Sequence, residues 1–134
     1  MDTRISLEDD RLLGARLTGR VVDCAVAVHR ALGPGLLEGA YRACLLYELQ
    51  RAGLSASSEV PIPLKYEGVE LPCGFRADLV IERKLLVELK AVERLLPIHS
   101  AQLLTYLKLC GCEVGLLMNF NATPLRSGFR RLVL

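Results

Sequence analysis

Three ionisable side chains lie inside an apolar segment near the middle of the chain, residues 74–92. Asp78, Glu88 and Lys90 are each flanked by aliphatic residues. An ionised group in an apolar strand costs free energy unless it is paired with an opposite charge or bound to a metal ion. Two carboxylates beside an ammonium group could hold a divalent cation and stabilise negative charge that develops in a reaction.

The pattern around these residues is typical of two β-strands joined by a tight charged turn at residues 82–84. Because strand side chains alternate between faces, Glu88 and Lys90 point the same way. A turn centred on Arg83 places Asp78 opposite Glu88 on that face, with Cβ atoms about 4.5–5.5 Å apart. Like charges at this distance destabilise the pair, and a divalent cation between them would reverse the sign. The hairpin therefore predicts half of a metal site with a lysine beside it.

The same spacing has a plainer interpretation, in which the face is solvated and Lys90 only neutralises Glu88. Leu86 and Val92 share that face, however, and the opposite face is apolar throughout. The residues on the opposite face are Phe75, Ala77, Leu79, Ile81, Leu85, Val87, Leu89 and Ala91. One apolar face and one mixed face fit a sheet that is covered by helices on both sides. Both interpretations of the charged residues stay open at this point.

The N-terminal part of the chain has the periodicity of helices. A short helix near residues 7–14 is expected in an N-terminal extension of residues 1–17. The domain itself, residues 18–134, opens with Thr18 as candidate N-cap of a helix from Gly19 to Leu32. The apolar stripe expected on this helix is Val22, Ala25, Val26, His29 and Leu32. A second helix is expected from about residue 36 to residue 52, with the core row Tyr41, Leu45 and Leu49.

The rest of the chain is predicted to be mostly β-structure, with a helix that Pro97 opens and that ends near Cys110. The expected strands are residues 59–66, 69–73, the two strands of the hairpin, 113–120 and 130–134. Two prolines in the first of these strands favour an edge position. The order α-α-β-β-β-β-α-β-β indicates a mixed α/β class without repeats or a linker.

Length and composition fit one globular domain. The chain has 134 residues. Its net charge is only +2, so the overall charge does not indicate a nucleic-acid-binding protein. Thirteen of the 17 basic residues are arginine, whose planar guanidinium group binds phosphate better than the ammonium group of lysine does. Because the net charge is low, a nucleic-acid-binding surface would be a local patch. The acidic, mixed N-terminus is unlike a signal peptide, and no apolar run is long enough to span a bilayer. We therefore expect a soluble cytoplasmic protein.

The cysteines give little sign of chemistry. Their number, five, is odd and no signal peptide precedes them, which argues against a disulfide framework. Cys110 and Cys112 have no second Cys or His pair at the spacing of a zinc site. All five, Cys24, Cys44, Cys73, Cys110 and Cys112, are expected to be small buried hydrophobic residues.

Two helices carry polar residues at helical spacing. Glu38 and Tyr41 lie one turn apart at the start of the second helix, where Glu38 could simply complement the helix dipole. In the third helix, His99, Gln102 and Tyr106 form a polar stripe between leucines. That stripe could equally be a solvent-exposed face.

Five short motifs, in order, resemble the GxxExxY protein family, which is grouped with the PD-(D/E)XK nuclease superfamily. They are residues 35–41 (GLLEGAY), 75–78 (FRAD), 87–90 (VELK), 101–108 (AQLLTYLK) and 118–120 (MNF). The resemblance extends from about Thr18 to the C-terminus. Ala77 stands where the superfamily name has proline, at a position without a chemical role. The resemblance implies a restriction-endonuclease-like core, a central mixed β-sheet with helices on both faces.

The resemblance also implies a site and a reaction. Glu38 would join Asp78 and Glu88 in binding Mg²⁺ (or Mn²⁺), together with the backbone carbonyl of Leu89 and several waters. The implied activity is hydrolysis of phosphodiester bonds in nucleic acid. The alternative is a nucleic-acid-binding, regulatory or structural module that keeps the nuclease fold without cutting. DNA and RNA stay equally open as substrates, no membrane is implied, and a homodimer would fit a small nuclease that acts on two strands.

The remaining site residues have supporting roles under the same resemblance. Lys90 would orient the attacking water and stabilise negative charge, since nearby carboxylates favour its charged form and make it a poor general base. Gln102 would position the phosphate or Lys90. The residues that would hold these groups in place without contacting the substrate are His29, Tyr41 and Tyr106.

Overall fold

The computed structural model describes the backbone of residues 7–134 and the side chains of residues 14–134. A five-stranded sheet forms its centre, in the order β1-β4-β5-β6-β7. The strands are β1 (Ala56–Pro61), β4 (Arg76–Ile81), β5 (Leu85–Lys90), β6 (Val114–Asn119) and β7 (Phe129–Val133). Only the β5–β6 pair is parallel, because the chain crosses over between these strands through a helix.

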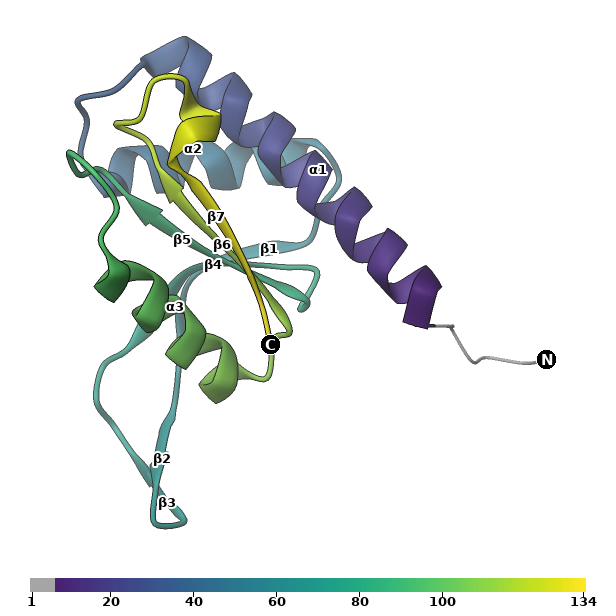
Figure 1. The fold of residues 1–134 in the computed structure, drawn as a ribbon, viewed down its shortest axis with the longest axis vertical. Helices are drawn as coiled ribbons and strands as arrows, with labels where there is room; N and C mark the ends of the chain where they lie inside the picture. Colours follow the sequence, from purple (N-terminus) through teal and green to yellow (C-terminus); the bar gives the residue numbers. More distant parts are fainter. Residues whose placement is uncertain (1–6) are drawn as a thin grey trace.

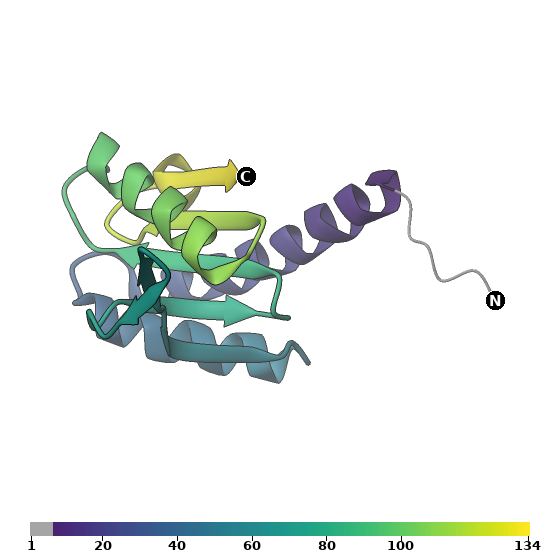
Figure 2. The same cartoon turned by 90° about the horizontal axis from the view of Figure 1, so that it is seen from below.

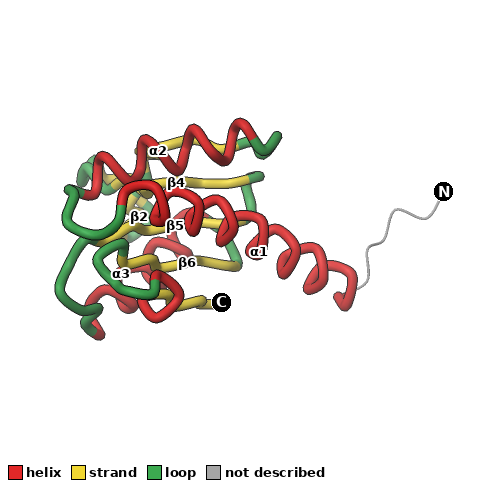
Figure 3. Tube along the Cα trace, turned by 90° about the horizontal axis from the view of Figure 1, so that it is seen from above, coloured by secondary structure: helices red, strands yellow, loops and turns green. Residues whose placement is uncertain are grey.

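Helices cover both faces of this sheet. The helices α1 (Leu7–Leu32) and α2 (Glu38–Arg51) lie on one face, and α3 (Pro97–Cys110) lies on the other (Figures 1 and 2). Seen from above, α1 and α2 lie side by side over the strands, and the N-terminal end of α1 extends past the sheet (Figure 3). A short 3₁₀ turn, η1 (Leu125–Gly128), precedes β7. The mixed α/β architecture with helices on both faces is as the sequence predicts.

The β4–β5 hairpin has the predicted register. Its turn places Glu82 and Arg83 at positive φ, 54° and 56°, the left-handed conformation that matches the twist of the flanking strands. Ile81 pairs with Leu85 and Leu79 with Val87, so the turn is centred on Arg83. Extending this register by one residue places Asp78 opposite Glu88.

The first helix differs from the prediction. The expected short helix and the expected helix from Gly19 are one continuous helix, so Thr18 is an interior residue rather than an N-cap. Residues 1–6 of the expected extension lie outside the described residues. The buried stripe is also different from the prediction, because it contains Val21, Cys24, Ala25 and Val28. The apolar side chains in this region are too evenly spread for periodicity alone to choose between neighbouring stripes. In α2, the predicted row of Tyr41, Leu45 and Leu49 is buried.

The predicted strand at residues 59–66 is two strands. The edge strand β1 ends at Pro61, and the chain then leaves the sheet to form a separate hairpin of β2 (Leu64–Tyr66) and β3 (Val69–Leu71), which projects from the body (Figure 1). Proline has no N–H for a strand ladder, so Pro61 and Pro63 favour this break. Five strands therefore precede α3, one more than expected. The edge position of β1 is as predicted.

Two hydrophobic clusters flank the sheet. The cluster under α1 and α2 contains Leu79, Val87 and Leu89, and the cluster under α3 contains Leu86, Leu103 and Leu117. Ala77 and Phe75 belong to the α3 side, although strict alternation from Leu79 would place them on the other. At the same level of the sheet, Glu59 lies across from Asp78 on β1 with a φ of 50°, outside the extended conformation of a regular strand.

The cysteines match the prediction in part. All five are free thiols, but only Cys24 and Cys112 are buried. Cys44 and Cys110 are half-buried, and Cys73 is exposed because it lies in the loop between β3 and β4, outside both clusters. Within residues 7–134, no helix combines the length and apolar character needed to cross a membrane.

Candidate active site

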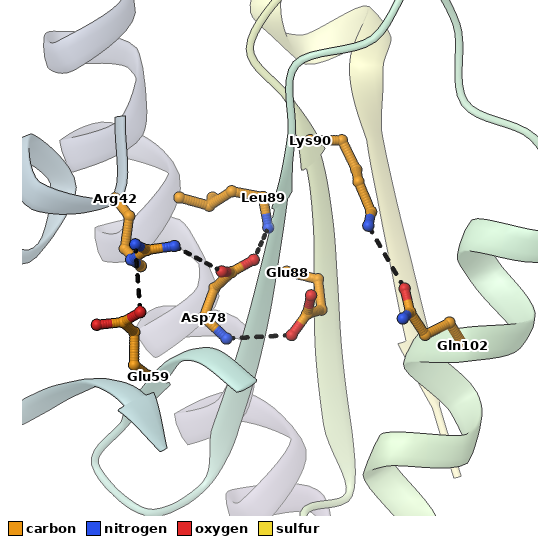
Figure 4. Close-up of polar contacts among 7 residues, drawn as sticks. All are labelled: Arg42, Glu59, Asp78, Glu88, Leu89, Lys90 and Gln102. Atoms are coloured by element: carbon orange, nitrogen blue, oxygen red, sulfur yellow. Dashed lines mark hydrogen bonds and ion pairs between the residues drawn. The ribbon is translucent and has the colours of Figure 1, made fainter. Parts of the chain in front are cut away.

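The two hairpin acids interlock across the strands. The backbone N–H of Asp78 donates a hydrogen bond to Oε1 of Glu88 at 3.1 Å, and the N–H of Leu89 donates to Oδ2 of Asp78 at 2.8 Å (Figure 4). Each carboxylate thus accepts a bond from the backbone of the opposite strand. The regular strand ladder ends at the Leu79–Val87 pair, and beyond it these side-chain hydrogen bonds connect the two strands. The two carboxyl groups are held at one point between β4 and β5.

Burial makes this pair electrostatically strained. Glu88 is only 5% exposed. Desolvation, and next the negative charge of Asp78, raise the pKa of Glu88 to about 8. The nearby Lys90 ammonium lowers this pKa, but its effect is smaller than either. The site would therefore gain from a further positive charge beside Glu88.

Lys90 continues the site toward α3. Its Nζ donates to Oε1 of Gln102 at 3.4 Å, and Nε2 of Gln102 donates to the Tyr106 hydroxyl at 3.2 Å (Figure 4 shows the first contact). Tyr106 is buried, and desolvation raises its pKa. The polar stripe on α3 therefore faces the sheet at Gln102 and Tyr106. His99 has a local role instead, since its Nδ1 accepts a bond from the Leu96 N–H at the start of α3.

The end of β5 is fixed by a buried asparagine. Asn119 is 2% exposed and clamps Val92, accepting from its N–H at 3.1 Å and donating to its carbonyl at 2.9 Å. Next to it, the N–H of Phe120 donates to the Lys90 carbonyl at 2.8 Å. The backbone on both sides of Lys90 is therefore held, which limits where its ammonium group can reach.

Arg42 is the site residue that the sequence analysis missed. Its Nη1 lies 3.2 Å from Oδ1 of Asp78, and its Nη2 lies 3.5 Å from Oε1 of Glu59 (Figure 4). The available signal was its position on α2, four residues after Glu38 and so on the same helical face. Helical spacing alone could not show that this face lies over Asp78.

Glu38 is not brought into a cluster with the hairpin acids. It is the first residue of α2 and is half-buried, one turn before Arg42. Across the described residues, no three His, Cys, Asp or Glu side chains gather closely enough to hold a metal ion. The structure therefore assembles Asp78, Glu88, Lys90 and Gln102, and leaves Glu38 on the adjoining helix.

Tyr41 and His29 lie against Phe120 rather than against the acids. Tyr41 is fully buried, stacks on Phe120 with a centroid distance of 4.6 Å, and donates from its hydroxyl to the Gly33 carbonyl at 2.6 Å. That hydroxyl also accepts from the Leu36 N–H, so it pins the loop that leads into α2. The His29 ring lies 6.3 Å from Phe120, and its buried Nε2 has no hydrogen-bond partner among the described residues.

Comparison with known proteins agrees with this architecture. A family model described as the PD-(D/E)XK nuclease superfamily matches residues 15–132, almost the whole chain. The chain therefore belongs to the PD-(D/E)XK nuclease superfamily. No curated protein and no solved structure matched it significantly.

Proposed function

We propose that this protein is a metal-dependent nuclease that hydrolyses phosphodiester bonds of nucleic acid with Asp78, Glu88 and Lys90. Membership of the nuclease superfamily supports this reaction class. The observation that carries the proposal is the interlocked acid pair, with Lys90 two residues beyond Glu88 and held toward the same side by Gln102. Within the superfamily, residues 35–41 support assignment to the GxxExxY group.

The acid pair fits a Mg²⁺ or Mn²⁺ ion in its donor chemistry. The carboxyl of Glu88 is buried beside a second carboxyl, and a dication would favour the ionised form of both. Mg²⁺ is commonly bound through one or two carboxylates and keeps several waters, so Asp78 and Glu88 suffice as protein acids. The Leu89 carbonyl would add an oxygen, and Glu38 would contribute directly or through a water. A bound metal would supply Lewis-acid stabilisation of the phosphoryl oxygens and an activated water.

The other residues would orient and stabilise the reacting groups. Lys90 would hold the attacking water in line and stabilise negative charge as it develops on the phosphate. Gln102, fixed by Tyr106, would keep the Lys90 ammonium aimed at that point. Tyr41 would act at a distance, by fixing the loop that positions Glu38, and His29 would support Phe120 beside it.

A cleavage assay tests the proposal directly. Purified protein would be incubated with Mg²⁺ or Mn²⁺ and a panel of single- and double-stranded DNA and RNA, beside Asp78→Asn and Lys90→Ala. We expect metal-dependent cleavage of at least one substrate by the parent protein, and loss of cleavage with retained substrate binding in both variants. A panel left uncut but bound would establish the alternative, a non-cleaving nucleic-acid-binding module. Sedimentation of the same samples would test whether the active form is a homodimer.

A further inference from the structure

A guanidinium group already occupies the outer side of the proposed metal site. Arg42 reaches from α2 to Oδ1 of Asp78 and is itself only 24% exposed. The other carboxylate oxygen of Asp78 accepts the Leu89 N–H. Both oxygens of this acid are therefore engaged by donors of this chain. Glu88, by contrast, has no basic side chain within ion-pair distance among the described residues, although it is the more deeply buried acid.

A third carboxylate, that of Glu59, contacts the other end of the same guanidinium. Glu59 of β1 lies 3.5 Å from Nη2 of Arg42 and is 55% exposed. Its φ of 50° is uncommon for a residue other than glycine, asparagine or aspartate. An observed backbone strain of this kind supports a functional role for the residue that carries it. Arg42 thus bridges a partly buried acid of the site and an exposed acid outside it.

We propose that Arg42 is an internal counter-ion of Asp78 that a divalent cation must displace, and that Glu59 receives the released guanidinium. The proposal rests on the proposed function only in taking Asp78 as a metal ligand. A dication and a guanidinium on the same carboxylate repel each other, so their binding is competitive. Arg42 then keeps Asp78 neutralised when no metal is present, and it weakens the site's affinity for metal. Once released from Asp78, Nη1 is free to contact a phosphate beside the metal, while Nη2 stays with Glu59.

Calorimetric titration with Mn²⁺ alone tests this competition without any substrate. We expect Arg42→Gln to bind Mn²⁺ at least about tenfold more tightly than the parent protein. Arg76→Gln is the matched control, because it removes an equal charge from an exposed position on β4, two residues before Asp78. It should change the affinity by less than about twofold, since screening weakens exposed charges. Arg42→Lys keeps the charge without the bidentate fork and should fall between the two.

A double-mutant cycle separates release to Glu59 from a general effect of charge. Glu59→Gln should weaken Mn²⁺ binding in the parent protein, because the guanidinium then has Asp78 as its only acid partner. In the Arg42→Gln background the same change should have little effect, which gives a coupling between the two sites. Equal effects of Glu59→Gln in both backgrounds would overturn the release to Glu59.

The outcomes also separate this inference from the proposed function. Unchanged or weaker Mn²⁺ binding in Arg42→Gln would overturn the counter-ion role and would mean that Arg42 positions Asp78 for the metal. Parent-like Mn²⁺ binding in Asp78→Asn would instead remove Asp78 as a ligand, and the proposed metal site would fall with the inference. Circular dichroism of each variant would confirm that it is folded.

Discussion

The two faces of the central sheet are built from the same strands but differ in kind. Under α1 and α2 the sheet contributes a large apolar cluster, which includes Leu79, Val87 and Leu89 together with the buried leucines of α2. The charged contacts of this layer are those of Arg42 with Asp78 and Glu59. Under α3 the cluster is smaller, and Glu88, Lys90 and Gln102 lie beside it. The α1/α2 face is therefore mainly an apolar core, whereas the α3 face also buries polar and charged groups, whose burial costs free energy.

This difference predicts how the two faces respond to mutation. Apolar side chains on the α1/α2 face should contribute to stability and leave the chemistry of the site unchanged. Charged residues on the α3 face should contribute to activity at the expense of stability, as sites with perturbed pKa values often do. A variant that broke this division would show that the faces are less independent than their packing indicates.

The largest expected effect is on the α3 face. Glu88→Gln keeps an oxygen that can accept the Asp78 N–H, and it removes the buried charge. Metal-dependent cleavage should fall by at least about 10³-fold, equivalent to about 4 kcal/mol of transition-state stabilisation. Chemical denaturation at pH 8 should show that the variant is at least as stable as the parent protein. A clearly less stable variant would show that the acid pair is a structural element.

The converse variant lies on the α1/α2 face. Leu45 is fully buried on α2, and Leu45→Ala should lower the free energy of unfolding by about 3 kcal/mol through lost burial and a residual cavity. Below the unfolding transition its Mn²⁺ affinity should match that of the parent protein. The control is Leu37→Ala, at a position that is 84% exposed, and it should change stability by less than about 0.5 kcal/mol. A changed metal affinity in Leu45→Ala would mean that the two faces are coupled.

The pH dependence of stability should distinguish the faces further. The folded pKa of Glu88, about 8, lies above its ordinary value of 4.5, so between these limits the folded state binds more protons than the unfolded state. The contribution of Glu88 to stability therefore falls as pH rises from about 4.5 to about 8, by at most about 1.4 kcal/mol per pH unit. The difference between the parent protein and Glu88→Gln, measured by denaturation across this range, should show that slope. Saturating Mg²⁺ should reduce it, because a cation favours the ionised carboxylate. An identical pH profile for the two proteins would contradict the burial of a strained carboxyl.

The smallest expected effect is at the back of the site. Tyr106→Phe removes the hydroxyl that accepts from Gln102 but keeps the ring in the α3-side cluster. Loss of one hydrogen bond should lower stability by about 1 kcal/mol. Cleavage should fall only a few-fold, because Gln102 still contacts Lys90. A loss as large as that of Glu88→Gln would place the tyrosine hydroxyl at the reacting groups.

Several features of the protein follow from the sequence by itself. The alternation of the hairpin and the odd-length turn centred on Arg83 place Asp78 across from Glu88, and the structure has this register. The row of Tyr41, Leu45 and Leu49 is buried as its spacing predicts. These are local properties, because a period of two or of 3.6 residues and the length of a turn determine which side chains share a face. Where the local signal was weak, as in the evenly apolar first helix, the predicted stripe was right only at Ala25 and Val26.

The tertiary structure alone decided which distant groups meet. Arg42 and Asp78 are 36 residues apart in the chain, and their contact depends on how α2 lies across the sheet. The same holds for Lys90 and Gln102, which come from β5 and α3. The placement of Glu38 outside a three-acid cluster and the change of face at Ala77 likewise depend on how the elements pack. No sequence period encodes the crossing of a helix over a strand, since many side chains from both elements determine it together.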